Sequence, residues 1–335
     1  VRRSSVIQIK DVRIERWPVA GAFTISRGSK SHVDVVLCTV TDGKYEGRGE
    51  ATPIYYHGET TETCAVAIRD FCLQSEGREL SRSSVNAHMP RGAARNALDC
   101  ALWDIEARRQ GVAVWKLAGL PQPKPLATAY TISIDEPAKM ERDARAAAGR
   151  GFALLKCKLG GDGDLDRIRA VRQGAPDVRL IVDANESWNE LDLVAEAQAL
   201  ATLGVELIEQ PIRHGEEFRL SGVGTPVPFC ADESCQDRAD MARLNDFPVI
   251  NIKLDKAGGL TEAIALRDEA QSAGKRLMLG CMLSTSLGIA PAFLLAQQAD
   301  WVDLDGALLL ASDREAGLVL QDGLLYAGTL WGLPR

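Results

Sequence analysis

The chain has 335 residues, of which 46% are hydrophobic and 25% charged, a composition ordinary for a soluble globular protein with a large core. Its net charge of -7, with no basic stripe, excludes a nucleic-acid partner, because binding to a phosphate backbone relies on clustered positive charge. Neither an apolar signal region nor a stretch of about 18 apolar residues occurs, so we expect a cytoplasmic protein with no membrane partner.

The eight cysteines form no C-x-x-C pair, and most lie within apolar runs. This pattern is typical of reduced thiols in a core rather than of a disulfide framework or a zinc site.

The first part of the chain predicts a small α+β capping domain over residues 1–120. Residues 7–50 alternate and are rich in β-branched side chains, with Asp42-Gly43 placed as a hairpin turn. Residues 21–32 are polar and contain glycine, and we interpret them as a long loop. Helices are expected over residues 62–73 and 93–109, the second ending at Gly111.

Residues 126–312 alternate apolar runs with amphipathic segments and predict a parallel (β/α) barrel. The runs are ATAYTISI, ALLKCKL, RLIVDAN, VELIEQP, PFCADES, VINIKL, RLMLGCML and WVDLDGA. A doubly wound open sheet is the alternative, but no G-x-G-x-x-G follows any run. Residues 318–326 resemble a hairpin that returns to the first domain, so residues 313–335 are expected to join the cap.

Polar residues lie near the carboxyl ends of most of these runs, where barrel enzymes build their sites. They are Lys156, Lys158, Asp183, Asn185, Glu209, Asp232, Lys253, Asp303 and Asp305. A single carboxylate at a strand end is most often a helix cap or a surface group. Carboxylates on successive strands repel one another unless a cation neutralises them, and an all-oxygen set favours Mg²⁺ over zinc. We therefore predict that Asp183, Glu209 and Asp232 bind Mg²⁺.

Lys156 and Lys158 are separated by one residue in the apolar run LLKCKLG at residues 154–160. Alternation along a strand places both ammonium groups on one side and Cys157 on the other. Burial and a like-charged neighbour both disfavour the charged form, so we expect a lysine pKa lowered from about 10.4 towards neutrality, where the amine can act as a base. The alternative is a pair of lysines that snorkel to solvent.

A metal with lysines on either side of it suggests one type of reaction. The metal would bind a substrate carboxylate and stabilise the enediolate formed when the adjacent carbon loses its proton, while a lysine takes that proton.

The segments KCK, VDANESW, IEQP, CADES, NIKLDKAGG and WVDLDG occur in this order. In order and spacing they resemble the muconate-lactonizing subgroup of the enolase superfamily, which uses a lysine base and Mg²⁺, and within it the dipeptide epimerases. The resemblance covers nearly the whole chain and implies a modified barrel with a cap and an isomerase activity. It implies that Lys158 and Lys253 are the two bases, with Lys156 lowering the pKa of Lys158. Asp303 and Asp305 would then receive the α-ammonium of a dipeptide.

The expected substrate is a dipeptide with a small first residue, L-Ala-L-Glu or L-Ala-D-Glu from murein peptides, epimerised at its second residue. An acidic side chain needs its own cation, and Arg27 in the segment ISRGS is the candidate. A solvated loop arginine is the alternative. Thr131 is also expected to bind substrate. Whether the chain forms a homo-oligomer stays open.

Three other interpretations stay open. A cycloisomerase, an o-succinylbenzoate synthase or an N-acylamino-acid racemase would use the same metal and lysines, but their substrates have no free ammonium for Asp303 and Asp305. A Schiff-base aldolase would use Lys158 or Lys253 as nucleophile and does not need the carboxylates. A non-catalytic barrel is the third. His57 is expected to be a solvated loop residue, and the alternative is a side chain that faces the site.

Overall fold

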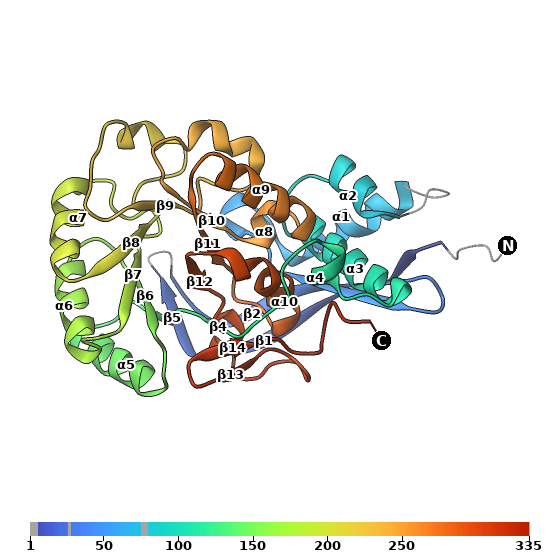
Figure 1. Cartoon of the computed structure of the whole chain (residues 1–335), viewed down its shortest axis with the longest axis horizontal. Coiled ribbons are helices and arrows are strands. Elements are labelled where there is room, and N and C mark those ends of the chain that lie inside the picture. Colours follow the sequence, from blue (N-terminus) through green and yellow to red (C-terminus); the bar gives the residue numbers. More distant parts are fainter. Residues whose placement is uncertain (1–5, 26–27, 75–79, 335) are drawn as a thin grey trace.

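The computed structural model describes residues 6–25, 28–74 and 80–334. A barrel of parallel strands lies beside a separate group of strands and helices (Figure 1), which confirms the predicted fold class. No helix in these ranges combines the length and the apolar character that a bilayer crossing requires.

The cap is an antiparallel sheet covered by helices. Its strands, in the order β1-β2-β3, are β1 (Gln8–Ile25), β2 (Gly28–Thr41) and β3 (Glu46–Ala51). Its helices are α1 (Thr61–Gln74), α2 (Arg82–His88), α3 (Ala93–Gln110) and α4 (Val114–Leu117). The predicted turn at Asp42 is confirmed, since the Asp42 carboxylate accepts the backbone N–H groups of Lys44 and Tyr45.

Helix α3 packs closely on β3. A Cβ at Gly49 would lie 2.0 Å from the carbonyl oxygen of Ala97, and a Cβ at Gly47 would lie 2.2 Å from that of Ala101. The glycines of the segment EGRGE are therefore required by this close approach of helix and strand.

The prediction of a loop over residues 21–32 is wrong. After a register shift between Pro18 and Phe23, β1 and β2 stay paired as far as Ile25 and Gly28. Glycine and serine in this stretch are typical of loops. Here they lie in a two-stranded ribbon of β1 and β2, where polar side chains are tolerated. The ribbon reaches the barrel, where the Ile134 N–H donates to the Thr24 carbonyl oxygen at 3.2 Å.

The barrel has eight parallel strands in sequence order. They are β5 (Tyr130–Ile132), β6 (Leu154–Lys158), β7 (Arg179–Asp183), β8 (Val205–Glu209), β9 (Phe229–Ala231), β10 (Val249–Ile252), β11 (Arg276–Gly280) and β12 (Trp301–Asp303). The Ala129 N–H donates to the Val302 carbonyl oxygen at 2.7 Å. This bond joins the first and last strands, so the sheet is nearly closed rather than open.

Helices connect most of the barrel strands. They are α5 (Pro137–Gly149), α6 (Asp164–Gly174), α7 (Leu193–Thr202), α8 (Leu254–Ala257), α9 (Leu260–Ser272) and α10 (Ser286–Leu295). Short 3-10 turns, η2 (Glu217–Leu220) and η3 (Arg238–Arg243), take the place of helices after β8 and β9. Two further turns, η1 (Tyr55–His57) and η5 (Gly306–Leu309), follow β3 and β12.

The C-terminal segment contacts both parts of the molecule. The predicted hairpin forms as β13 (Val319–Gln321) and β14 (Leu324–Tyr326), and β14 pairs with β4 (Leu126–Ala127) at the start of the barrel. Beyond it, the Trp331 indole donates to the Cys100 carbonyl oxygen at 3.2 Å, and the Gly332 N–H donates to Asp104 Oδ1 at 2.8 Å, both on α3.

The barrel interior is built in layers. One layer is apolar and contains one buried side chain from, or next to, each barrel strand: Ala129, Leu154, Ile181, Leu207, Cys230, Val249, Met278 and Trp301. Because strand side chains alternate, the residues two positions further along face the same interior. These are Thr131, Lys156, Asp183, Glu209, Asp232, Asn251, Gly280 and Asp303, all buried and, apart from the glycine, polar. The candidate site is this second layer.

Candidate active site

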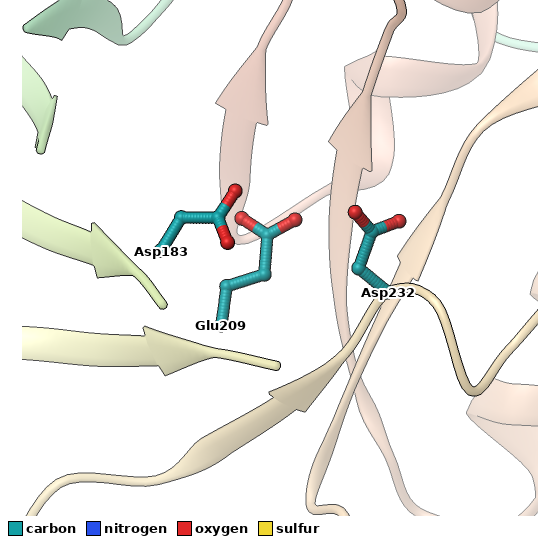
Figure 2. A group of neighbouring side chains, drawn as sticks. All are labelled: Asp183, Glu209 and Asp232. Carbon is teal, nitrogen blue, oxygen red and sulfur yellow. The ribbon is translucent and has the colours of Figure 1, made fainter. Parts of the chain in front are cut away.

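Asp183 and Glu209 at the ends of β7 and β8 and Asp232 directly after β9 bring their carboxylates into one group (Figure 2). One oxygen of each lies within 4.8 Å of those of the other two, and all three residues are buried. Burial and the charge of Asp183 raise the pKa of Glu209 to about 8. Like charges held together away from water are the environment that a cation stabilises, and oxygen donors suit a hard divalent ion.

Lys156 lies in the middle of this layer. Its ammonium is 2.5 Å from Glu209 Oε2, 2.8 Å from Asp303 Oδ2 and 3.1 Å from Asp183 Oδ2. The sequence predicted that burial beside a like charge would lower the pKa in this lysine pair. For Lys156 the direction is the opposite, because the carboxylates, Asp303 first, outweigh burial and raise its pKa.

Lys158 and Lys253 lie at the ends of β6 and β10, the strands on either side of the three strands that position the carboxylates. Lys158, at the end of β6, places Nζ 2.6 Å from Asp183 Oδ2. Lys253, just after β10, places Nζ 2.6 Å from Asp232 Oδ2. Burial disfavours the Lys253 ammonium, but Asp232 and Glu209 outweigh it and raise its pKa. Since β7, β8 and β9 lie between β6 and β10, the two amines approach the carboxylates from opposite sides.

Gly280 on β11 leaves room for the side chain of Lys253. A Cβ at this position would lie 2.8 Å from Asn251 Oδ1 and 3.0 Å from Lys253 Cε. A residue larger than glycine at position 280 would therefore collide with the side chains of Asn251 and Lys253.

Asp232 is held by residues that sequence reasoning did not select. Lys256 is buried and donates to Asp232 Oδ1 at 2.6 Å and to the Cys235 carbonyl oxygen at 2.7 Å. Gln210 Oε1 accepts the Asp232 N–H at 2.9 Å. Burial raises the pKa of Asp232, but the neighbouring ammonium groups, Lys253 first, lower it by more. The pKa of Asp232 therefore lies well below its ordinary range.

The signal for these supporting residues was present but weak. Lys256 belongs to the segment NIKLDKAGG and Gln210 to IEQP, but membership of a motif does not indicate which residue a side chain contacts. Asn251 was missed in the same way, although its amide donates to Glu209 Oε1 at 2.7 Å.

Asp303, which contacts Lys156, and Asp305 form a second pair of buried carboxylates. Among the described residues, Asp303 Oδ1 is a buried acceptor with no hydrogen-bond partner. Asp305 Oδ2 accepts the Thr131 N–H at 2.6 Å, so Thr131 orients this carboxylate. Burial and the charge of Asp303 raise the pKa of Asp305 to about 7. Asp303 and Asp305 thus provide buried acceptor oxygens beside the cluster of Asp183, Glu209 and Asp232.

A cavity of about 280 Å³ opens above these groups, between barrel and cap. Its lining combines site residues with the hairpin ribbon and the segments after β3 and β11: Phe23, Ile25, Gly28, Ser29, Lys30, Thr52, Tyr55, Tyr56, Lys158, Asn185, Asp232, Glu233, Lys253, Cys281, Met282 and Leu283. Arg27 lies outside the described residues. His57 is exposed, and its ring lies 4.6 Å from that of Tyr56 and 6.3 Å from that of His214. All eight cysteines are free thiols.

Two family descriptions match the chain. Residues 7–119 match the mandelate racemase / muconate lactonizing enzyme N-terminal domain, and residues 139–332 match the enolase C-terminal domain-like family. Together they cover the cap and the barrel.

The chain is 43% identical over 313 residues to the L-Ala-D/L-Glu epimerase of Escherichia coli strain K12, covering 93% of this chain and 97% of that protein. It is 39% identical over 302 residues to an N-acetyl-D-glutamate racemase of a Pseudoalteromonas species, covering 89% and 95%. These names confirm the prediction of an isomerase of the racemase and epimerase class.

Two solved structures extend the comparison. One is an enolase family member from Agrobacterium tumefaciens, with homology to dipeptide epimerases and bound sodium and L-Ala-L-Glu. It has a TM-score of 0.91 and 45% identity, covering 98% of this chain and 99% of that one. The other is a dipeptide epimerase of Enterococcus faecalis V583 with Mg and L-Leu-L-Tyr, with a TM-score of 0.89 and 30% identity, covering 98% of each chain. The chain belongs to the mandelate racemase / muconate lactonizing enzyme family of the enolase superfamily.

Proposed function

We propose that this protein is a Mg²⁺-dependent dipeptide epimerase that inverts the α-carbon of the second residue. The observation that carries the proposal is the placement of Lys158 at the end of β6 and of Lys253 just after β10, so that the two amines contact the carboxylate cluster at its two ends. Inversion of a stereocentre requires one group to remove the proton and another to return it from the opposite face.

Asp183, Glu209 and Asp232 are the residues that hold the Mg²⁺. Their buried, crowded oxygens fit a divalent cation, and no softer donor contributes to the cluster. When bound, the ion neutralises the negative charge that develops on the substrate carboxylate as the α-proton leaves. Lys156 adds a fixed positive charge among the same oxygens.

In one direction, the unprotonated amine of Lys158 accepts the α-proton, and the ammonium of Lys253 donates a proton to the opposite face of the same carbon. Each turnover leaves Lys158 protonated and Lys253 neutral, which is the protonation state that the reverse direction requires. A bound substrate must displace both lysines from their present contacts with Asp183 and Asp232.

The free amino terminus of the dipeptide binds Asp303 and Asp305. The unpartnered Asp303 Oδ1 supports this assignment, because a buried acceptor without a donor carries a cost that a substrate ammonium would remove. Thr131 contributes through its N–H, which fixes Asp305.

The preferred substrate is L-Ala-L-Glu or L-Ala-D-Glu, the dipeptide of murein. Similarity to a protein named for that epimerisation supports this choice. Arg27 stays a prediction as a cation for the glutamate side chain. Arg27→Met should raise KM for Ala-Glu and spare dipeptides with an apolar second residue.

Racemisation of an N-acylated glutamate is the second candidate, favoured by the similarity to an N-acetyl-D-glutamate racemase. Incubation of the protein in D₂O with a dipeptide panel and with N-acetyl-L-glutamate distinguishes the two. We expect deuterium at the α-carbon of Ala-Glu and much less in N-acetylglutamate. Faster exchange of the N-acetyl compound would replace the first proposal by the second.

A further inference from the structure

The proposed base Lys253 is attached to a very short helix. It is the N-cap of α8, which has only four residues. Lys256 on the same turn contacts the proposed metal ligand Asp232, as Lys253 does. A helix this short has little stability of its own, so its position depends on the contacts that it makes with neighbouring segments.

Helix α3 of the cap contacts the end of α8 and the start of α9. The guanidinium of Arg95 is buried and donates to the carbonyl oxygens of Ala257 at 2.6 Å and of Gly258 at 3.1 Å. Carbonyl groups at the end of a helix lack helical partners, and an arginine can satisfy them. One turn further along α3, Asp99 accepts the N–H of Thr261 at 2.9 Å. The cap therefore holds the segment that follows α8.

Two glycines allow this close approach. A Cβ at Gly258 would lie 2.3 Å from Arg95 Nε, and a Cβ at Gly259 would lie 2.5 Å from Asp99 Oδ2. Their φ angles are 83° and 119°, in the region that favours glycine. The end of the segment NIKLDKAGG is thus suited to packing against α3.

Asp255 is the contact between the cap and the first turn of α8. It is buried, and its Oδ1 accepts the Thr52 N–H at 3.0 Å and the Asn96 amide at 2.9 Å. Thr52 follows β3 and Asn96 lies on α3, so both donors belong to the cap. Asp255 is two residues from Lys253 in the chain, and this contact fixes the turn on which the amine begins.

Lys158 is held in a different way. It is the last residue of β6 and is paired with Asp183 in the register of β6 and β7, so the barrel sheet fixes its backbone. Lys253 lies beyond the last pair of β10 and β11, Ile252 with Leu279. The backbone of one proposed base therefore belongs to the barrel ladder, whereas that of the other is held from the cap.

We propose that Asp255 is a positioning residue for Lys253, through which the cap places the amine on one face of the substrate. This inference rests on the proposed function. Asp255 is not among the residues that line the cavity, so it acts through the backbone of α8. Displacement of a reacting group by about 1 Å can lower a rate roughly 10²-fold. Loss of this contact should therefore impair proton transfer by Lys253 and spare proton transfer by Lys158.

The test follows loss of the α-proton from L-Ala-L-Glu and from L-Ala-D-Glu in D₂O, with each protein saturated with Mg²⁺. Lys253→Ala first identifies the epimer from which Lys253 takes the proton, as the one that no longer exchanges. Asp255→Ala should lower the initial exchange rate of that epimer roughly 10- to 100-fold and that of the other epimer by less than about 3-fold. Asp255→Asn, whose amide oxygen can accept both hydrogen bonds, should restore most of the lost rate.

Asp104 provides a matched control on the same helix of the cap. It is buried, and its carboxylate also accepts two backbone N–H groups, those of Arg48 at 3.0 Å and of Gly332 at 2.8 Å. Neither of these residues belongs to α8. Asp104→Ala should lower the melting temperature but leave the ratio of the two exchange rates unchanged, because a loss of folded protein lowers both rates by the same factor.

The outcomes separate this inference from the function on which it rests. If wild type epimerises no dipeptide, or if Lys253→Ala epimerises normally, the proposed function fails. If wild type is active and Asp255→Ala keeps the ratio of the two exchange rates, or lowers the rate of the other epimer more, the function stands and the role of Asp255 is wrong. If Asp255→Ala does not fold, Asn96→Ala removes one of the two donors instead. It should lower the ratio in the same direction, and an unchanged ratio would overturn the proposal.

Discussion

Lys158 and Asp183 are direct partners in the register of β6 and β7, and the Nζ of the lysine lies 2.6 Å from Oδ2 of the aspartate. The proposed base Lys158 and the proposed metal ligand Asp183 are thus in direct contact. Any substitution of Lys158 changes the charge beside Asp183, so metal affinity has to be measured for every lysine variant before a loss of turnover is assigned to proton transfer.

Asp232→Asn should weaken Mg²⁺ binding and abolish turnover, because it replaces a charged ligand by a neutral one. Isothermal titration with Mg²⁺ measures the first effect without relying on activity. Asp300→Asn is the control, since Asp300 pairs with Arg276 away from the site. Full activity of wild type in EDTA would contradict the metal requirement.

Asp305→Asn should raise KM for dipeptides with a free amino terminus roughly 10- to 100-fold, since it removes one charged acceptor for the ammonium. The α-N-acetylated dipeptide, which has no ammonium, should be affected much less. Steady-state kinetics with L-Ala-L-Glu and its N-acetyl derivative provide the comparison. An equal rise in KM for both substrates would mean that Asp305 supports the structure of the site and does not bind the ammonium.

Lys256→Met should lower the free energy of unfolding by about 3–5 kcal/mol, because it leaves part of the buried Asp232 charge without its partner. Lys275→Met is the matched control. The Lys275 ammonium donates to the carbonyl oxygens of Leu244 and Phe247, so its loss should cost only about 1–3 kcal/mol. Urea denaturation measures both values, and equal losses would remove the special role of Lys256.

Asp255 predicts a pH dependence of stability. Burial raises its pKa from 3.8 to about 7, so the folded state favours the protonated carboxyl. The resulting stabilisation is complete below about pH 4 and is lost as the pH rises through 7. Asp255→Asn does not titrate, so its stability relative to wild type should increase between pH 4 and 8. Urea denaturation across this range should show that trend, and a constant difference would contradict the assignment.

The polar interior layer of the barrel could be predicted from sequence, because it follows from the alternation of side chains along each strand. Asp183 and Glu209 end apolar runs in which every second residue faces the barrel interior, and the strand order of a barrel brings successive ends together. The same reasoning placed Lys156 inside but predicted the wrong direction for its pKa. The carboxylates that surround it come from strands far apart in the chain, and alternation gives no distances.

The parts that depend on tertiary contacts between segments far apart in the chain could not be predicted. Lys30 lies in the stretch interpreted as a loop, and only the crossing of the β1–β2 ribbon to the barrel brings it to the cavity. The role of Lys256 follows from its contact with Asp232, which joins α8 to the segment after β9. Sequence spacing indicates which face a residue occupies, whereas the partner on that face is set by tertiary packing.

The most direct test of the two-base mechanism follows L-Ala-L-Glu and L-Ala-D-Glu in D₂O with wild type, Lys158→Ala and Lys253→Ala, each saturated with Mg²⁺. Wild type should interconvert the epimers with deuterium at the α-carbon. Each variant should lose epimerisation by roughly 10²- to 10⁴-fold while still exchanging the α-proton of one epimer, a different one for each variant. Normal epimerisation by either variant, or exchange of the same epimer by both, would contradict the assignment of Lys158 and Lys253 to opposite faces of the substrate.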